Sequence, residues 1–273
     1  MSAAKFGSLT DEPDCWPEQG QLILNRCTYG AFTGQGVSAK DRITWLSRQD
    51  PSKFSQDFWP QPWEHCAKVL REMGHRNDAR LVLIDKEQRQ RAWNRSKMPA
   101  WQKPLAWTKD KLLATTIGYG HKPLLAFRWL TLFWLFGILL FWVANDAYAF
   151  KPNNAFVLRA PEWVLCAHSR GELVQLPSNG RFQPGLANPA EPQLACFLRQ
   201  KEASSFPKFN PLTYSADTLF PLVDMEMQSH WLPNEDAGPI GQSARIYLWV
   251  HIFVGWALSL LAVAGFSGLV RND

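Results

Sequence analysis

The stretch LLAFRWLTLFWLFGILLFWVA, residues 124–144, decides the fold of this chain because it contains a single charged side chain, Arg128. A second stretch, IYLWVHIFVGWALSLLAVAGFSGLV at 246–270, contains one histidine, His251, and no formal charge. A bilayer core of about 30 Å is crossed by about 20 apolar residues of helix, whose backbone amides are all satisfied internally. We therefore predict membrane-spanning helices at 124–145 and 246–270. The alternative, two buried helices of a soluble core, predicts shorter runs with a polar stripe.

Charge is distributed unequally around these two stretches. Residues 1–124 contain 19 Lys or Arg and 13 Asp or Glu, whereas residues 146–245 contain 8 and 10. Lys and Arg are enriched in the cytoplasmic flanks of membrane proteins, and the first 20 residues include no apolar run typical of a signal peptide. We therefore expect both termini in the cytoplasm and residues 146–245 on the opposite side of the membrane.

The five cysteines fit this topology. Cys166 and Cys196 are the two cysteines between the spans, and in an oxidising compartment we expect them to form a disulfide. Two free thiols are the alternative. Cys15, Cys27 and Cys66 fall in the cytoplasmic part without a regular metal-ligand spacing.

Taken together, these patterns predict a mainly α protein with two transmembrane helices. We expect a flexible amino terminus with a short strand (1–36), a cytoplasmic helical domain with a basic, tryptophan-rich juxtamembrane segment (37–122), the first span (124–145), an extracytoplasmic domain of mixed and irregular structure (146–245), the second span (246–270) and a cytoplasmic tail (271–273).

The cytoplasmic part contains a predicted helical hairpin. A shorter helix precedes it, for which Ser38 can act as the N-cap. PWEHCAKVLREMG and RNDARLVLIDKEQRQRAWNR both have apolar residues at helical spacing, and Gly74 offers the turn between them. A single hairpin cannot bury its apolar faces alone, so we expect it to pack on the preceding helix, a partner or the membrane surface. The candidate partner-binding residues are Trp63, Leu70, Arg76 and Arg80.

Tryptophans and lysines alternate immediately before the first span. This pattern is typical of segments that place indoles among lipid head groups and lysines on anionic lipid, although single-stranded nucleic acid is bound by a similar pattern. Arg128, near the cytoplasmic end of the span, can extend its guanidinium to the head groups. The candidate lipid-interface residues are Trp93, Trp101, Lys103, Trp107, Lys109, Lys111 and Arg128.

The stretch FNPLTYSADTLFPLVD, residues 209–224, is too interrupted by proline to span a membrane and too apolar for a free linker. We expect it to lie along the outer leaflet or to dock on the exposed sides of the two spans. It is the candidate outer brace, with Tyr214, Asp217, Phe220 and Asp224 as its characteristic residues.

No constellation in the sequence predicts catalysis. The stretch IGYGH at 117–121 lacks the third glycine of a dinucleotide-binding turn. His251 has no histidine opposite it in the first span with which it could hold a haem. A cation site at Asp217, Asp224 and Glu226 is possible by composition, but carboxylates in such positions are normally caps. We therefore predict no catalytic, cofactor-binding or metal-binding residues.

Several stretches together resemble a family of bacterial membrane-anchored proteins, catalogued as pentapeptide-repeat-containing proteins or as membrane-associated oxidoreductases. They include LNRCTYGAF, RITWLSRQ, PQPWEHCAKVLREMGHRNDARLVLIDKEQRQR, FPKFNPLTYSADTLFPLVDM, HWLP and GWALSLLAVAGFSGLVR. The resemblance covers roughly 22–271 and implies a bacterial inner-membrane location. Members of the family carry an amino-terminal β-helix of short repeats, of which only QLILNRCTYGAF remains here. The resemblance to this family implies no catalytic residue in this chain.

The expected function is a non-catalytic anchor, scaffold or accessory subunit of a membrane assembly. Its expected partners are anionic lipids and proteins of that assembly, and nucleic acid is not expected. The alternatives are a membrane-associated oxidoreductase, as the family label implies, and an oligomeric transport or ion-coupling component.

Overall fold

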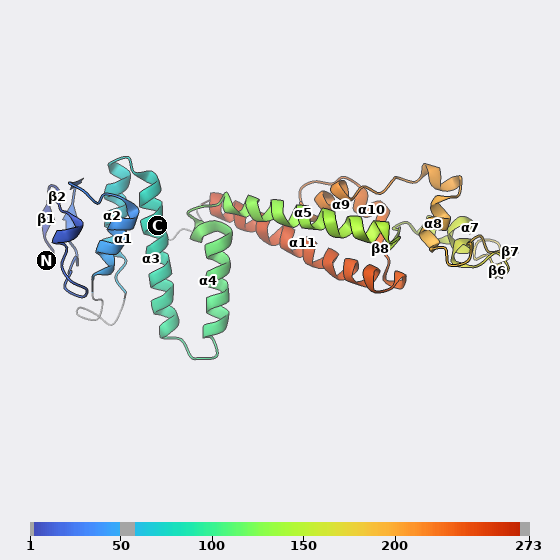
Figure 1. Ribbon diagram of the computed structural model, residues 1–273, viewed down its shortest axis with the longest axis horizontal. Helices are drawn as coiled ribbons and strands as arrows, with labels where there is room; N and C mark the ends of the chain where they lie inside the picture. The colour runs from blue at the N-terminus through green and yellow to red at the C-terminus, as the bar shows by residue number, and fades with distance from the viewer. Residues whose placement is uncertain (1–2, 50–57, 268–273) are drawn as a thin grey trace. The chain divides into compact units, whose positions relative to one another are not determined.

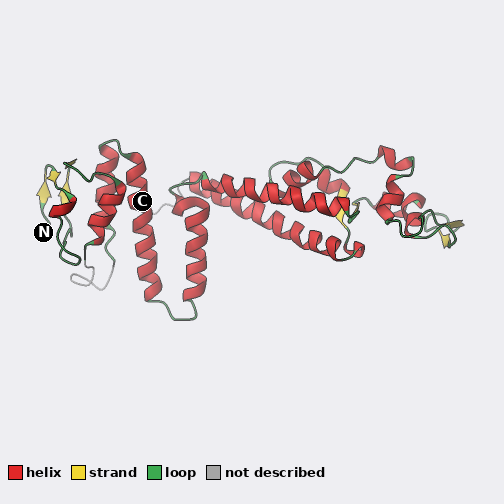
Figure 2. Ribbon diagram, in the orientation of Figure 1, coloured by secondary structure: helices red, strands yellow, loops and turns green. Residues whose placement is uncertain are grey.

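A computed structural model describes residues 3–49 and 58–267, so the predicted tail at 271–273 and the end of the second predicted span lie outside the described residues. The chain divides into two compact units, Met1–Leu125 with Ala264–Asp273, and Ala126–Val263. Both units are dominated by helices, and strands are few and short (Figure 2). The prediction of a mainly α protein is confirmed.

The first unit begins with two pairs of parallel strands. β1 (Lys5–Phe6) pairs with β3 (Thr28–Tyr29), and β2 (Leu9–Thr10) pairs with β4 (Phe32–Thr33). A short 3-10 helix, η1 (Pro13–Cys15), lies between β2 and β3 in sequence. The partner strands are separated by the same number of residues in both pairs, so residues 5–10 lie alongside residues 28–33. This segment therefore has defined structure although each strand is very short.

Helices follow the strand pairs in the first unit (Figure 1). They are α1 (Ala39–Ser47), α2 (Gln61–Glu72), α3 (Arg76–Ser96), α4 (Lys103–Ile117) and the 3-10 helix η3 (Gly118–Gly120). Ser38 caps α1 by accepting a hydrogen bond from the backbone N–H of Asp41. Gly74 has φ +91°, a conformation that glycine adopts without strain, and it separates α2 from α3. The predicted hairpin is therefore present.

One hydrophobic core holds the strand pairs against the hairpin. Its fully buried members come from α1, α2 and α3 and include Leu46, Cys66, Leu70 and Val82. Tyr29 and Phe32 of the strand segment join the same cluster. The apolar faces of the hairpin are thus covered by α1 and the strand segment of the same chain.

The second unit is built around two helices that are long and apolar enough to cross a membrane, α5 (Leu125–Asp146) and α11 (Pro239–Phe266). They run antiparallel, because Phe141 packs beside Tyr247 while Leu130 clusters with Leu258. α11 begins at Pro239 rather than at Ile246, because Gly238 at φ +81° ends the preceding segment and proline suits the first turn of a helix. This amino-terminal extension contains polar residues such as Gln242 and Arg245.

The chain between α5 and α11 forms short elements around a second core. Its helices are α6 (Ala155–Arg159), α7 (Pro161–Val164), η4 (Leu165–Ala167), α8 (Gln193–Leu198), η5 (Glu202–Ser205), α9 (Pro211–Leu219), α10 (Met227–His230) and η6 (Glu235–Ala237). Two antiparallel pairs join β5 (Phe150–Pro152) to β8 (Trp231–Pro233) and β6 (Leu173–Gln175) to β7 (Phe182–Pro184). The β5–β8 pair ties the chain leaving α5 to the chain approaching α11.

Candidate functional site: the apolar helix pair and its surroundings

The predicted outer brace docks on both apolar helices. Its helix, α9, begins after Asn210, whose side-chain oxygen accepts hydrogen bonds from the N–H groups of Leu212 and Thr213. Figure 1 shows α9 beside α5 and α11, and hydrogen bonds to both confirm the contact. The sequence left two positions open for this segment, along the outer leaflet or docked on the two apolar helices. In the structure the segment is docked on the helices.

Hydrogen bonds fasten α9 to the middle of α5. The Ser215 hydroxyl donates to the carbonyl oxygen of Trp134 at 2.9 Å, and the Trp134 indole donates to the carbonyl oxygen of Leu212 at 3.3 Å. Trp134 is nine residues beyond the start of α5 at Leu125, about 14 Å along the axis at 1.5 Å per residue. The brace therefore packs against the central part of α5.

His251 of α11 joins the same cluster. Its Nε2 lies 3.1 Å from the carbonyl oxygen of Ser215 and 3.3 Å from the Ser215 hydroxyl, and its Nδ1 lies 3.0 Å from the Tyr247 hydroxyl. With the proton on Nε2, the imidazole donates to Ser215 and accepts from Tyr247, so both ring nitrogens are satisfied. His251 is fully buried in this arrangement. Its position favours a structural link between α9 and α11.

Two glycines permit this close approach. A Cβ atom added at Gly255 would lie 1.9 Å from the carbonyl oxygen of Leu219, and one added at Gly137 would lie 2.3 Å from the Ser215 hydroxyl oxygen. No side chain fits at either distance. The packing of α9 on α5 and α11 therefore requires glycine at both positions.

The predicted brace residues take different positions. Tyr214 is fully buried and its ring packs edge-on against Phe141, with centroids 4.9 Å apart. Asp217 accepts hydrogen bonds from the N–H groups of Met225 and Gln228 at 2.6 and 2.7 Å, which closes the chain between α9 and α10.

The other two brace residues complete the turn after α9. Phe220 packs against the cluster of Leu130, Leu219 and Leu258. Asp224 accepts a hydrogen bond from the N–H of Glu226 at 2.9 Å. The carboxylates of Asp217 and Asp224 thus act as acceptors within turns. Among the described residues, no group of three or more His, Cys, Asp or Glu side chains is placed to hold a metal ion.

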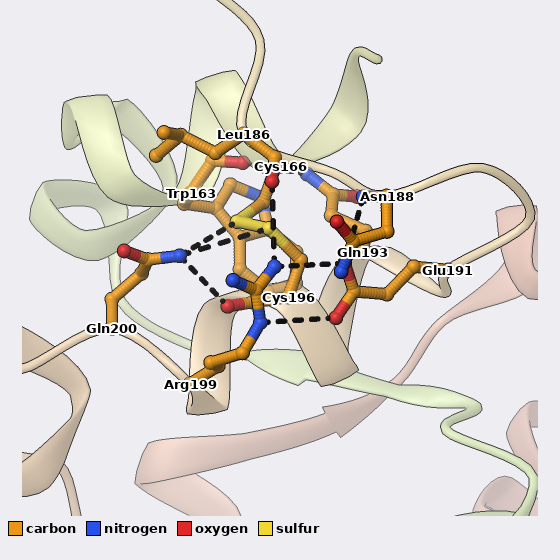
Figure 3. Close-up of a disulfide and its surroundings, with 9 residues drawn as sticks. All are labelled: Trp163, Cys166, Leu186, Asn188, Glu191, Gln193, Cys196, Arg199 and Gln200. Atoms are coloured by element: carbon orange, nitrogen blue, oxygen red, sulfur yellow. Dashed lines mark hydrogen bonds and ion pairs between the residues drawn. A yellow bond between two sulfur atoms is a disulfide. The ribbon is translucent and has the colours of Figure 1, made fainter. Parts of the chain in front are cut away.

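A disulfide joins Cys166 of η4 to Cys196 of α8, with Cα atoms 5.5 Å apart (Figure 3). This prediction is confirmed. Both cysteines are buried, and the Gln200 amide donates to the Cys196 carbonyl oxygen at 3.1 Å. The bridge links η4 to α8 covalently within the second core, which also contains Trp163, Leu194 and Phe197.

An ion pair lies beside the disulfide (Figure 3). Arg199 Nη2 lies 2.8 Å from Glu191 Oε2. The pKa of the Glu191 carboxyl is lowered by the hydrogen bond from the Asn188 N–H and by Arg199. The pair thus fixes the chain on both sides of α8.

The predicted lipid-interface residues cluster on and before α4. Trp101 is 77% exposed and Leu105 is 76% exposed, and Trp107 and Leu112 are also exposed. Lys103, Lys109 and Lys111 are exposed on the same helix, and Lys111 Nζ lies 5.8 Å from the centroid of the Trp107 ring. Trp93 is half-buried on α3, and Arg128 is exposed in the first turns of α5.

Asp110, which the sequence patterns did not single out, fastens α4 to α3. Its carboxylate pairs with Arg95 and lies 3.4 Å from Arg91 Nη1. The Arg91 guanidinium also lies 5.1 Å from the centroid of the Tyr119 ring, and burial raises the pKa of the Tyr119 hydroxyl. α4 is therefore fastened to α3, while Leu105 and Leu112 of α4 remain exposed.

The four candidate partner-binding residues divide into two pairs. Trp63 and Leu70 lie in the core of the first unit, where the Trp63 indole donates to Asp85 at 2.9 Å. Arg76 and Arg80 are exposed one turn apart on α3. Only this second pair is available on the surface.

A buried ion pair in the first unit escaped the sequence patterns. The Arg42 guanidinium donates to both carboxylate oxygens of Asp11, at 2.8 and 2.6 Å, and lies 3.8 Å above the centroid of the Phe32 ring. Arg42 is fully buried. One signal was available, because Arg42 lies at helical spacing with Ala39, Trp45 and Leu46 on the buried side of α1.

No protein-family model matches this chain, and neither the curated proteins nor the solved structures contain a match. The geometry of these residues is therefore the basis for the functional proposals.

Proposed function

We propose that this protein is a non-catalytic, two-span anchor or accessory subunit of an assembly in the bacterial inner membrane. The observation that carries the proposal is the apolar surface of α5 and α11. Large apolar side chains are exposed along both helices, among them Leu132, Leu135, Phe136, Leu139, Trp142, Val143, Ile246, Trp249, Val250, Phe253, Trp256, Leu260 and Val263. A large apolar surface of this kind promotes aggregation in water, whereas the hydrocarbon core of a bilayer solvates it.

The packing between the helices supports the same proposal. Polar groups of Ser215, Tyr247 and His251 meet between α9 and α11, whereas most side chains exposed along α5 and α11 are apolar. This is the arrangement expected of a membrane-embedded bundle, where unsatisfied polar groups are costly against lipid. α9, with its amino terminus capped by Asn210, then lies partly within the membrane as a third packed element.

Charge and the disulfide support the proposed orientation. The segment before α5 is basic, and the segment between α5 and α11 is slightly acidic and contains the Cys166–Cys196 bridge. Basic residues favour the cytoplasmic face, and disulfides persist in the periplasm. The first unit thus faces the cytoplasm, and the disulfide-closed part of the second unit faces the periplasm.

The proposed partner surface is the exposed side of the α2–α3 hairpin. Glu72, Asn77 and Leu81 are exposed there, while the same hairpin is held rigidly by the core beneath it. A rigid helical surface of mixed charge with an exposed leucine suits a protein partner, because little ordering is required on binding. The anchor holds that partner at the membrane.

Site-specific photo-cross-linking tests this function. Benzoylphenylalanine at Leu81 or Asn77 is expected to cross-link in cells to the same partner, giving an adduct of one mass from both positions. The same group at Lys40, exposed on α1, is the matched control and is expected to give no such adduct. Absence of an adduct from both hairpin positions contradicts the anchoring role.

Spectroscopy of the detergent-purified protein separates this function from catalysis. We expect no visible absorption band. A bound haem or flavin would contradict the non-catalytic proposal and support the oxidoreductase alternative, whereas a symmetric homo-oligomer in native mass spectrometry would support the transport alternative.

A further inference from the structure

A cavity of about 840 Å³ in the first unit is lined by four cationic side chains, Arg71, Arg76, Arg80 and Lys122. Arg71 lies in the last turn of α2, and Arg76 and Arg80 lie one turn apart at the start of α3. Lys122 follows η3. All four are exposed, so their charges converge on one solvent-accessible space.

No carboxylate balances these charges among the described residues that line the cavity. The acidic residues nearest in sequence are occupied elsewhere. Glu72 faces Lys68, with Oε1 and Nζ 3.9 Å apart, and Asp78 accepts a hydrogen bond from the Ala39 N–H at 2.9 Å. Farther along α3, by contrast, Arg89 pairs with Asp85 and Arg91 pairs with Glu87. Within the described part of the chain, the positive charge at the cavity is therefore uncompensated, which favours an anionic ligand.

Apart from His121, the other side chains that line the cavity are apolar. They include Leu83, Pro123, Leu124, Leu125 and Phe266. Leu124 is 69% exposed and Phe266 is 60% exposed, although both are large and apolar. Leu125 is the first residue of α5 and Phe266 is the last of α11, so this wall lies where both apolar helices end. A ligand that fits must be anionic at one end and hydrocarbon at the other.

We propose that this cavity binds an anionic phospholipid, with its phosphate at Arg76 and Arg80 and its acyl chains along Leu124 and Phe266. One guanidinium group can donate two parallel hydrogen bonds to the oxygens of a phosphate. Basic pockets at the cytoplasmic ends of transmembrane helices suit anionic head groups. A volume of about 840 Å³ suits a head group and the first carbons of its chains. This inference rests on the proposed crossing of the membrane by α5 and α11.

The apolar wall distinguishes this ligand from the other anions that arginines bind. A soluble phosphate would leave Leu124 and Phe266 in water, whereas an acyl chain covers both and is stabilised by burial of its methylene groups. An acidic protein partner at Arg76 and Arg80 is the other alternative, and the test includes it.

The test uses the full-length protein in an uncharged detergent and dioctanoyl phosphatidylglycerol as the probe, with binding measured by native mass spectrometry. We expect the R76Q/R80Q variant to bind this lipid about 30-fold more weakly, because each basic residue near an anionic head group contributes about 1 kcal/mol and 1.4 kcal/mol is tenfold in affinity. The charge-matched control, K5Q/K40Q, removes two exposed lysines that do not line the cavity and is expected to bind like the wild type.

Two further probes separate the possible ligands. Dioctanoyl phosphatidylcholine has the same phosphate and chains but no net charge, and glycerol phosphate has the phosphate but no chains. We expect both to bind more weakly than the phosphatidylglycerol. Equal binding of glycerol phosphate would overturn the lipid assignment in favour of a soluble phosphate. If both double variants lose lipid binding equally, the binding depends on the net charge of the protein and not on this cavity. That result would also overturn the proposed lipid site.

Hydrogen exchange on the wild type provides a test that needs no variant. Phosphatidylglycerol is expected to slow amide exchange at residues 76–83 and 120–125, and no slowing would overturn the proposal. Loss of the photo-cross-link from R76Q/R80Q with lipid binding intact would assign these arginines to a protein partner instead. Lipid binding and the cross-link at Leu81 are separate measurements, so failure of the anchoring role is distinguishable from failure of this site.

Discussion

Arg42 illustrates how much of this protein depends on single side chains. Its guanidinium is fully buried, pairs with both oxygens of Asp11 and lies over the Phe32 ring. The sequence places Arg42 on the buried side of its helix, but its partner is 31 residues away and belongs to an irregular segment. Such a pairing depends on tertiary packing, so no local pattern could predict it.

Asp11→Asn tests the importance of this ion pair. Removing one partner of a buried pair leaves an uncompensated charge, and we expect the free energy of unfolding of the first unit to fall by about 3–5 kcal/mol. Pulse proteolysis in urea, on the detergent-solubilised protein, measures this change. Asp14→Asn, at an exposed position in the same segment, is expected to change the stability by less than about 0.5 kcal/mol. Equal stability of the two variants would contradict the argument.

Cys66 is a second buried group whose chemistry is set by packing. Burial raises the pKa of its thiol from 9.0 to about 12. The thiol therefore stays protonated at pH 7 to 9 in the folded chain, and we expect iodoacetamide to modify the exposed Cys15 but not Cys66. Peptide mass spectrometry after alkylation measures both, and rapid modification of Cys66 in the folded protein would contradict its burial.

The same shift gives a pH dependence of stability. The thiol ionises near pH 9 in the unfolded chain and near pH 12 in the folded one, so its contribution is fully present below pH 9 and is lost as the pH rises toward 12. Replacing Cys66 with alanine is expected to weaken this alkaline loss of stability, which urea unfolding at pH 8 and pH 10.5 measures.

At the scale of elements, helices were predictable and their contacts were not. The two apolar helices and the α2–α3 hairpin follow from runs and periodicities within the sequence, and each prediction is confirmed to within a few residues at most helix ends. The docking of α9 depends on Gly137 and Gly255, which in sequence are two glycines within apolar runs. Close backbone approach has no local signature, so the sequence left two positions open for the brace.

Gly255→Ala tests the docking of α9. The added methyl group would collide with the Leu219 carbonyl oxygen, and relieving such overpacking costs about 1–3 kcal/mol. We expect the amides of residues 211–219 to exchange roughly 5- to 150-fold faster, measured by hydrogen-exchange mass spectrometry. In Gly171→Ala the new methyl group meets no atom within 4 Å, and exchange of 211–219 should remain unchanged. Unaltered exchange in Gly255→Ala would show that α9 is not tightly packed.

At the scale of the whole molecule, the two units have different chemical characters. The first has three cysteines that form no disulfide, a basic composition and an exposed tryptophan-bearing helix, whereas the second contains the disulfide. The sequence predicted this division from charge and cysteine positions. It could not predict the cavity at Arg76 and Arg80, because the cavity is formed by segments about 45 residues apart and by the end of α11.

Labelling of single cysteines in intact cells tests the proposed arrangement across the membrane. Ser178 and Gln88 are exposed in the second and first units, and Cys15 is replaced by serine to remove the exposed native thiol. With the first unit in the cytoplasm, an impermeant maleimide is expected to react with Ser178→Cys in intact cells and with Gln88→Cys only after the inner membrane is opened. Positive charge before α5 and the disulfide between the helices both favour this order. Reaction of Gln88→Cys in intact cells, with Ser178→Cys silent until lysis, would invert the orientation and remove the basis for a cytoplasmic lipid site.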